Sequence, residues 1–113
     1  MKEQRTEIAE NIRKASIKYE FPTLQSARVF EEVLPDVADL FLEKNKDYGD
    51  AAVHLGAKGQ FADMNRKFWK MKSALWDGKK LSGEPIEEVV RDMIGHCLLT
   101  LLFLLEETEE PFK

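Results

Sequence analysis

The sequence is poor in the residues that build disulfide or metal-stapled scaffolds. Its 113 residues include one cysteine, Cys97, and two histidines, His54 and His96. A single thiol cannot form a disulfide framework, and these three side chains cannot assemble a structural zinc site or a histidine-rich metal site. Stability must therefore come from one hydrophobic core, which a chain of this length with 43% hydrophobic residues can form.

Long hydrophobic runs are also absent. The longest, residues 97–105, is far shorter than the roughly 20 residues that span a bilayer. The first five residues are charged and polar after Met1 and lack the apolar centre of a signal peptide. We therefore expect a cytoplasmic protein in a reducing compartment, with no membrane partner.

The charges are segregated along the chain. Residues 24–50 carry seven acids and three bases, residues 63–80 carry two acids and six bases, and residues 84–113 carry eight acids and two bases. Two acidic segments thus flank a basic one, and the net charge is −4. Proteins that grip duplex DNA usually present a broad basic face, so duplex nucleic acid is an unexpected partner.

Helical periodicity dominates, and no segment alternates like a strand. We predict an all-α bundle of about four helices in one domain, with an amphipathic N-terminal helix in residues 1–22 and a core bundle in residues 23–113. The helices are expected at about 3–20, 24–45, 61–77 and 84–107, with Thr23 capping the second and Gly78 ending the third. Pro35 should kink or divide the second helix near Leu34.

The apolar stripes predict which side chains are buried. The first helix would bury Ile8, Ile12, Ala15 and Tyr19, the second Phe30, Val33, Leu34, Val37, Leu40 and Phe41, and the third Met64, Phe68, Met71, Leu75 and Trp76. Residues 46–60 contain Gly49, Gly56 and Gly59 and are predicted to be one long, functional connection.

The last helix predicts self-association. From Cys97 to Leu105 every residue except Thr100 is apolar, so this half has no polar face for solvent. Four short helices in a monomer can hardly enclose one member on all sides. A homodimer or higher homo-oligomer with this helix at the interface is therefore the economical explanation.

Carboxylates recur at helical spacing on two of the predicted helices. Glu32, Asp36, Asp39 and Glu43 follow one another at spacings of four, three and four, and this stripe is either a solvated face or a Mg²⁺ site. On the last helix, Glu88 and Asp92 are four residues apart and could share a cation. His96 follows them, and we expect it to be a hydrogen-bonded histidine of the core rather than a catalytic base or a metal ligand.

The basic segment offers a second chemistry. Arg66, Lys67 and Lys70 fall on one side of the third helix, where they form either a solvated face or a clamp for phosphate groups. Nearby aromatic side chains could stack on a base but are expected in the core. Residues 44–50 combine charge, an aromatic ring and a glycine, which indicates function more than packing.

These residues resemble a family of small, mostly phage-borne proteins described as nucleotide modification associated domain type 1 or as MazG-like nucleotide pyrophosphohydrolases. The matching segments are Lys44-Asn45-Lys46-Asp47-Tyr48-Gly49-Asp50, Phe61 with residues 65–70, and Glu84-Pro85-Ile86-Glu87-Glu88 with Asp92. Together they extend over about residues 44–105.

The resemblance implies a fold similar to the dimeric all-α nucleoside triphosphate pyrophosphatases and a reaction that needs Mg²⁺. Glu88 and Asp92 would be catalytic. The metal ligands would come from Glu32, Asp36, Asp39, Glu88 and Asp92. The nucleotide would be bound by Lys46, Asp47, Tyr48, Asp50, Arg66, Lys67, Lys70 and His96.

The leading hypothesis is a Mg²⁺-dependent pyrophosphohydrolase of a free nucleotide, or a phage protein associated with nucleotide pools or base modification. A phage-encoded protein would be located in the host cytoplasm. The alternative is a non-catalytic nucleotide-binding protein of the same fold that sequesters a signalling nucleotide. A helical interaction module without a small ligand is a third hypothesis.

Overall fold

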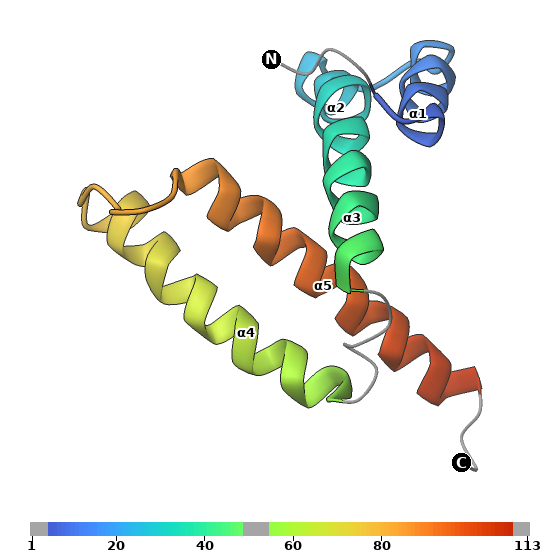
Figure 1. Ribbon diagram of the computed structural model, residues 1–113. Helices are drawn as coiled ribbons and strands as arrows, with labels where there is room; N and C mark the ends of the chain where they lie inside the picture. The colour runs from blue at the N-terminus through green and yellow to red at the C-terminus, as the bar shows by residue number, and fades with distance from the viewer. Residues whose placement is uncertain (1–4, 49–54, 110–113) are drawn as a thin grey trace. The chain divides into compact units, whose positions relative to one another are not determined.

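The protein is all-α. The computed structural model describes residues 5–48 and 55–109, and side chains within residues 5–47 and 55–106, and these residues form helices and turns with no strand (Figure 1). The fold class predicted from the sequence is confirmed. The chain divides into two compact units, Met1–Tyr48 and Gly49–Lys113, each of which is described by itself. The predicted boundary at residue 22 stays a prediction.

The first unit begins with α1 (Glu7–Ile17), whose N-cap is Thr6. The Thr6 hydroxyl accepts a hydrogen bond from the Ala9 N–H (3.1 Å), which satisfies one of the free donors at the helix start. A second helical run follows from residue 24 to residue 48, made of α2 (Leu24–Arg28), the π-helical turn η1 (Val29–Val33) and α3 (Leu34–Tyr48). Thr23 caps it as predicted and forms a capping box with Ser26.

Pro35 changes the type of this helix without ending it. Proline has no N–H to donate, and its ring crowds the carbonyl four residues earlier. The chain widens into the π-helical turn just before it, where the Leu34 N–H donates to the Val29 carbonyl instead of to that of Phe30. The Pro35 ring is fully buried. The disturbance predicted near Leu34 is thus a π turn inside a continuous helical run.

Small and polar side chains fill the contact between α1 and α3. Ala9 and Ser16, seven residues apart on α1, are buried, and so are Val37 and Asp39 on α3. The predicted stripe was wrong here, because Ile8 and Tyr19 are exposed, Tyr19 by 70%. Small residues allow the two backbones to approach closely, so the buried face of α1 is the side with the short side chains.

The second unit is an antiparallel helical hairpin. It consists of α4 (Gly56–Met71), the π-helical turn η3 (Lys72–Trp76) and α5 (Ile86–Glu109), and α4 packs along α5 (Figure 1). Gly78 has φ +72° directly after the helix end, the left-handed conformation that glycine adopts without strain. The predicted stop is correct. The predicted start near Phe61 was too late, because residues 56–60 are helical.

The face of α4 that is buried differs from the predicted one. Gln60 and Lys67 are buried, while Phe68, Leu75 and Trp76 are exposed, Trp76 by 83%. Met64 and Met71 are half-buried, and Val89 of α5 is fully buried. An amphipathic pattern shows that apolar residues share a side, but α4 carries apolar residues on two sides, and the methionine side is the one packed in this hairpin.

The C-terminal half of α5 keeps its leucines half-exposed. Within residues 97–106, exposure exceeds two-fifths for Leu98, Leu101, Leu102, Leu104 and Leu105. None of the helices in the described ranges combines the length and hydrophobicity needed to cross a bilayer.

Candidate functional site

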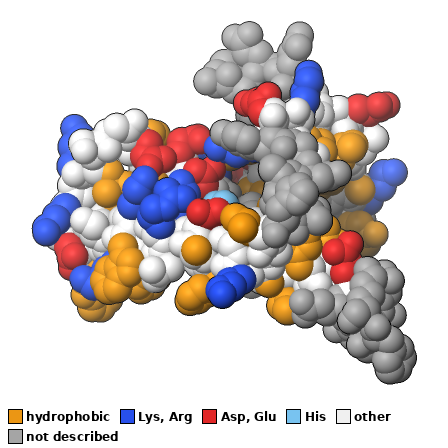
Figure 2. Space-filling view, turned by 60° about the horizontal axis from the view of Figure 1, so that its bottom comes forward, with side chains coloured by type: hydrophobic (Ala, Val, Ile, Leu, Met, Phe, Trp, Pro, Cys, Tyr) orange, Lys and Arg blue, Asp and Glu red, His pale blue; other side chains and the backbone are white. Residues whose placement is uncertain are grey.

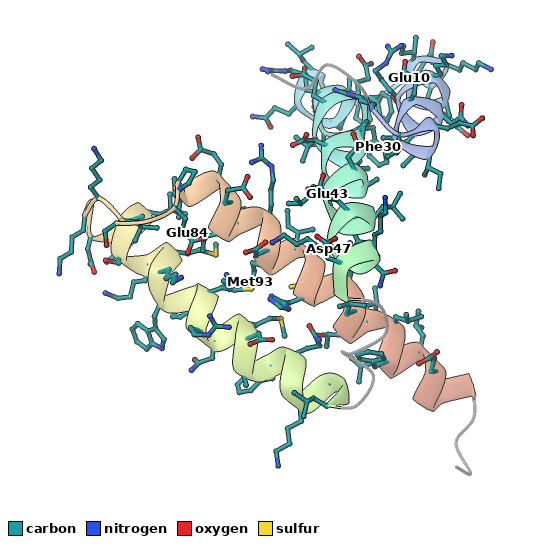
Figure 3. The ribbon with its side chains drawn as sticks, viewed as in Figure 1. Glu10, Phe30, Glu43, Asp47, Glu84 and Met93 are labelled. Carbon is teal, nitrogen blue, oxygen red and sulfur yellow. The ribbon has the colours of Figure 1, made fainter. Side chains whose placement is uncertain are left out.

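A strip of polar side chains lies between α4 and α5. From α4 come Gln60, Asp63, Lys67 and Lys70, at spacings of three, four and three; from the α5 side come Glu84, Glu88, Asp92 and His96, at spacings of four. Such spacings place the α4 set on one face of its helix and Glu88, Asp92 and His96 on one face of α5, while Glu84 lies in the turn just before α5. The labelled side chains of Glu84 and Met93 lie on the side of α5 toward α4 (Figure 3). The hairpin therefore opposes a row with two lysines to a row with three carboxylates.

The centre of this strip is an ion pair between Lys67 and Asp92. The Lys67 ammonium donates to Asp92 Oδ2 at 2.9 Å, and the two side chains are only 10% and 14% exposed. Two charges so far from solvent are costly to desolvate and are stable only when they neutralise each other. The sequence predicted Lys67 as a phosphate ligand and Asp92 as a metal ligand, and here each is the other's partner.

A second inter-helical ion pair lies one turn away. The Lys70 ammonium donates to Glu84 Oε2 at 2.6 Å, just before α5 begins. This hydrogen bond is the main reason that the pKa of Glu84 lies below its ordinary value, with the positive charges of Lys70 and Lys67 adding to the effect and partial burial opposing it. Two lysines one turn apart are thus both held by carboxylates of the facing element.

The flanks of the strip carry ion pairs within single helices. Arg66 donates to Asp63 at 2.8 Å on α4, and Arg91 donates to Glu88 at 3.0 Å on α5. These pairs are more exposed, and such pairs contribute little to stability. Figure 2 shows acidic and basic side chains side by side on this part of the surface. Five predicted site residues therefore lie in the strip, and Arg66 lies on its flank. The five are Lys67, Lys70, Glu88, Asp92 and His96.

His96 lies at the far end of the strip from Glu84. Its Nδ1 is 2.8 Å from Gln60 Oε1, so with that oxygen as acceptor Nδ1 carries the proton. Burial is the main cause of a pKa below the ordinary value, and the neighbouring charges of Asp63, Lys67, Asp92 and Arg66 act in opposing directions. A lowered pKa keeps the ring neutral at pH 7. This geometry agrees with the interpretation preferred from the sequence, in which His96 is a hydrogen-bonded core histidine.

Two of the predicted metal ligands, Glu32 and Asp39, have hydrogen-bond partners within the first unit. Glu32 accepts two hydrogen bonds from Arg28, at 2.8 and 3.2 Å, and these lower its pKa. Asp39 is 6% exposed and accepts the Thr6 N–H at 2.8 Å, which anchors the start of α1. An anion at a helix N-terminus is favoured by the free N–H groups there. The predicted stripe of carboxylates thus divides, because Glu32 is solvated and Asp39 is buried.

The remaining predicted residues lie around the end of α3. Lys46 and Asp47 are exposed on its last turn, and Asp36 is half-buried nearer its start. The side chain of Tyr48 and the whole of Asp50 lie outside the described residues. The predicted loop at residues 46–60 is shorter than expected, because α3 extends to Tyr48 and α4 begins at Gly56.

The carboxylates of the hairpin fit Mg²⁺ only in a limited way. Within residues 5–47 and 55–106, no three His, Cys, Asp or Glu side chains lie together as a ready-made metal site. Glu88 and Asp92 are one helical turn apart, and Mg²⁺ is often bound by one or two carboxylates with water and substrate phosphates completing the shell. These two residues would hold the ion together with a phosphate-bearing ligand.

Sequence reasoning missed two members of the strip. Gln60 was placed in the loop, although Gln60, Met64, Lys67 and Met71 have the spacing of one helix face. Glu84 entered the sequence analysis only as part of the segment that carries the resemblance, and its pair with Lys70 was not predicted. Its partner is 14 residues away, across the turn, and only the packing of the hairpin identifies it.

No protein-family model, curated protein or solved structure matches the chain. The resemblance described from residues 44–105 therefore stays a prediction.

Proposed function

We propose that the chain is a Mg²⁺-dependent nucleotide pyrophosphohydrolase that binds the phosphates of its substrate in the strip between α4 and α5. The observation that carries this proposal is the pair of lysines, Lys67 and Lys70, each held by a carboxylate of the facing element. A phosphate is a stronger and more highly charged acceptor than a carboxylate, and it can replace Asp92 and Glu84 as the partner. The lysines would then clamp adjacent phosphate groups.

The exchange gives the acidic row a second role. Once Lys67 bonds to a phosphate, Asp92 exchanges this cation for another, and it lies one helical turn from Glu88 on the same face of α5. In this proposal these two carboxylates hold Mg²⁺ and orient the attacking water. The cation would neutralise the charge that develops on the phosphoryl oxygens. Attack of water on phosphorus breaks the bond to the bridging oxygen and releases a nucleoside monophosphate and pyrophosphate.

The second candidate is a nucleotide-binding protein that does not hydrolyse its ligand. One observation favours it: Asp63, Glu84, Glu88 and Asp92 each have a basic partner within the hairpin. Carboxylates neutralised in this way suit a site that exchanges anions more than one that concentrates metal ions. Either function acts on free nucleotides, so the cytoplasm, of the host if the chain is phage-encoded, is the proposed location.

The test is incubation of the purified protein with canonical, modified and cyclic nucleotides, with and without Mg²⁺, followed by chromatography. Monophosphate and pyrophosphate formed only with Mg²⁺ support hydrolysis. In that case Asp92→Asn should abolish turnover while the helical circular dichroism persists, and Asp77→Asn, at an exposed aspartate outside the strip, is the matched control. A nucleotide recovered intact, and only after denaturation, would identify a binding protein. Full recovery of every free nucleotide would contradict both proposals.

We also propose that the protein self-associates through the C-terminal half of α5. Its half-exposed leucines at positions 98, 101, 102, 104 and 105 recur every three or four residues, which is the spacing of a helix-pairing face. Leu101→Glu places a charge at the middle of this face and should convert an oligomer to a monomer in light scattering after gel filtration. A folded variant with an unchanged particle mass would contradict this interface. Glu106→Lys, at the end of the run, is the control for charge alone.

A further inference from the structure

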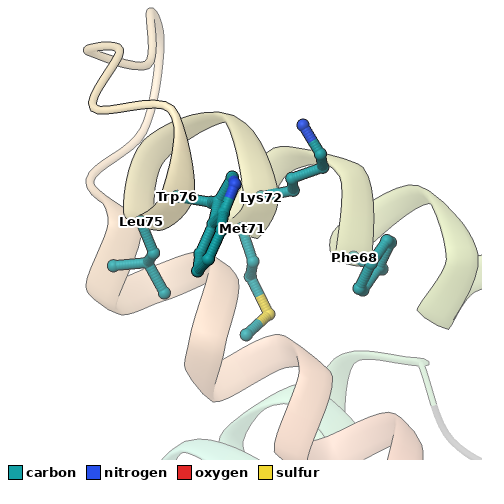
Figure 4. Close-up of a pocket in the computed structure, with 5 residues that line it drawn as sticks. All are labelled: Phe68, Met71, Lys72, Leu75 and Trp76. Carbon is teal, nitrogen blue, oxygen red and sulfur yellow. The ribbon is translucent and has the colours of Figure 1, made fainter.

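The outward side of α4 and η3 carries a face of aromatic and basic residues that the strip does not use. We call it the aromatic face and define it by Phe61, Phe68, Trp69, Lys72, Leu75 and Trp76. Phe61, Phe68, Trp69, Leu75 and Trp76 are all exposed, by 49% to 83%. Phe68, Lys72, Leu75 and Trp76, with Met71, line a shallow surface pocket (Figure 4).

This face is separate from the proposed nucleotide site. Phe61, Phe68 and Lys72 are seven and four residues apart and share one side of the helix. Gln60 and Lys67, which join the strip, are also seven apart and are buried toward α5. A ligand on the strip therefore cannot stack on these rings, and the aromatic face needs another explanation.

The charge around the face indicates an anionic partner. Of the six bases in residues 63–80, Arg66, Lys67 and Lys70 belong to the strip or its flank, which leaves Lys72, Lys79 and Lys80 on and beside the aromatic face. Lys72 lies among the rings, with its ammonium 3.1 and 3.2 Å from the Asp77 carboxylate oxygens, and Lys79 and Lys80 are exposed in the turn that follows. At the left end of Figure 2, where this hairpin turns, hydrophobic and basic side chains reach the surface side by side.

We propose that the aromatic face binds single-stranded nucleic acid. Exposed rings with lysines between them match the requirements of unpaired bases, which stack on aromatic side chains while the backbone phosphates meet cations. A duplex hides its base faces within its own stack. The centres of protein interfaces are usually depleted of lysine, whereas Lys72 lines the pocket itself. A membrane-binding helix keeps its lysines on the polar side, away from its rings.

The experiment uses the full-length protein and its own fluorescence, because both tryptophans, Trp69 and Trp76, lie on the aromatic face. Single-stranded oligothymidylate should quench the emission, and a hairpin duplex of equal charge should quench it less. Phosphate contacts by Lys72, Lys79 and Lys80 predict that log affinity falls against log salt with a slope of about −2.

Variants separate stacking from charge. Trp76→Ala should weaken binding about tenfold, the effect of losing one stacked base, and Trp76→Phe should retain most of the affinity. Lys79→Glu with Lys80→Glu should reduce the salt slope to about −0.7. Tyr19→Ala, which removes an equally exposed ring from α1, is the matched control and should bind like the parent protein.

Four results would overturn the proposal. One is emission that oligothymidylate leaves unchanged. Another is a response to anionic phospholipid vesicles but not to oligonucleotide, which would assign the face to a membrane surface. The third is a blue shift that follows protein concentration alone, which would mean that a second copy covers the face. Loss of oligonucleotide binding in Lys67→Met, with the fold intact, would place the strand in the strip instead.

Discussion

The Lys67–Asp92 pair makes the sharpest prediction about stability. Lys67→Met keeps the length of the side chain and removes its charge, leaving the Asp92 carboxylate, 14% exposed, without its buried cation. Removing one partner of a buried ion pair costs about 3–5 kcal/mol. Domains of this size have unfolding free energies of about 5–15 kcal/mol and lose roughly 4–8 °C in Tm per kcal/mol. The variant should therefore melt more than about 10 °C below the parent protein.

The assay is urea unfolding followed by circular dichroism, without nucleotide. A double variant, Lys67→Met with Asp92→Leu, replaces both charges by apolar groups and should be more stable than Lys67→Met alone, because no uncompensated charge stays buried. Lys70→Met is the comparison, since its pair with Glu84 is more exposed and should contribute much less to stability than the Lys67–Asp92 pair. A loss below about 1 kcal/mol in Lys67→Met, or strictly additive effects in the double variant, would refute this account of the strip.

Three further predictions concern titration and capping. Lys70 lowers the pKa of Glu84 in the folded protein. The Glu84 carboxylate therefore contributes stability above the unfolded pKa of about 4.5, and this contribution is lost as the pH falls through the lower folded pKa. Between pH 6 and pH 3 the Tm should fall less steeply in Glu84→Gln than in the parent protein. In an NMR titration the pKa of His96 should lie below 6.5, because burial disfavours the charged ring, and a pKa above 6.5 would contradict the burial. The contribution of His96 to stability is likewise present above about pH 6.5 and lost at lower pH. Thr23→Ala should cost about 1 kcal/mol through loss of the N-cap, whereas Gln25→Ala, at an exposed side chain of the same helix, should have a smaller effect.

Much of the local structure could be predicted because its causes lie within a few residues. Thr23 caps a helix through its own hydroxyl and Ser26, and Gly78 ends one because it alone tolerates φ +72° at that position. The start of α4 was harder to predict. Gly56 and Gly59 favour a loop locally, yet α4 begins at Gly56, whose φ of +60° is a conformation that glycine adopts without strain. Within the helix, Gly59 costs about 1 kcal/mol in propensity, but a Cβ there would lie only 2.3 Å from the Cβ of Leu55.

The candidate site could be predicted only as a set of residue types. Spacing indicated that Arg66, Lys67 and Lys70 share a side of one helix and that Glu88 and Asp92 share a side of another. It could not show that Lys67 and Asp92 neutralise each other, because their atoms are 25 residues apart in sequence and 2.9 Å apart in the fold. The same holds for Asp39, which periodicity grouped with solvated carboxylates and which the contact with Thr6 buries.

The sequence by itself determined the all-α class, the helical runs and most of their ends, because backbone hydrogen bonds, caps and glycine conformations act over one or two turns. The tertiary structure decided which side of each helix is covered and which charges meet. A helix such as α4 carries apolar residues on two sides, and only its neighbour selects the side with Met64 and Met71 and leaves Phe68 and Trp76 at the surface.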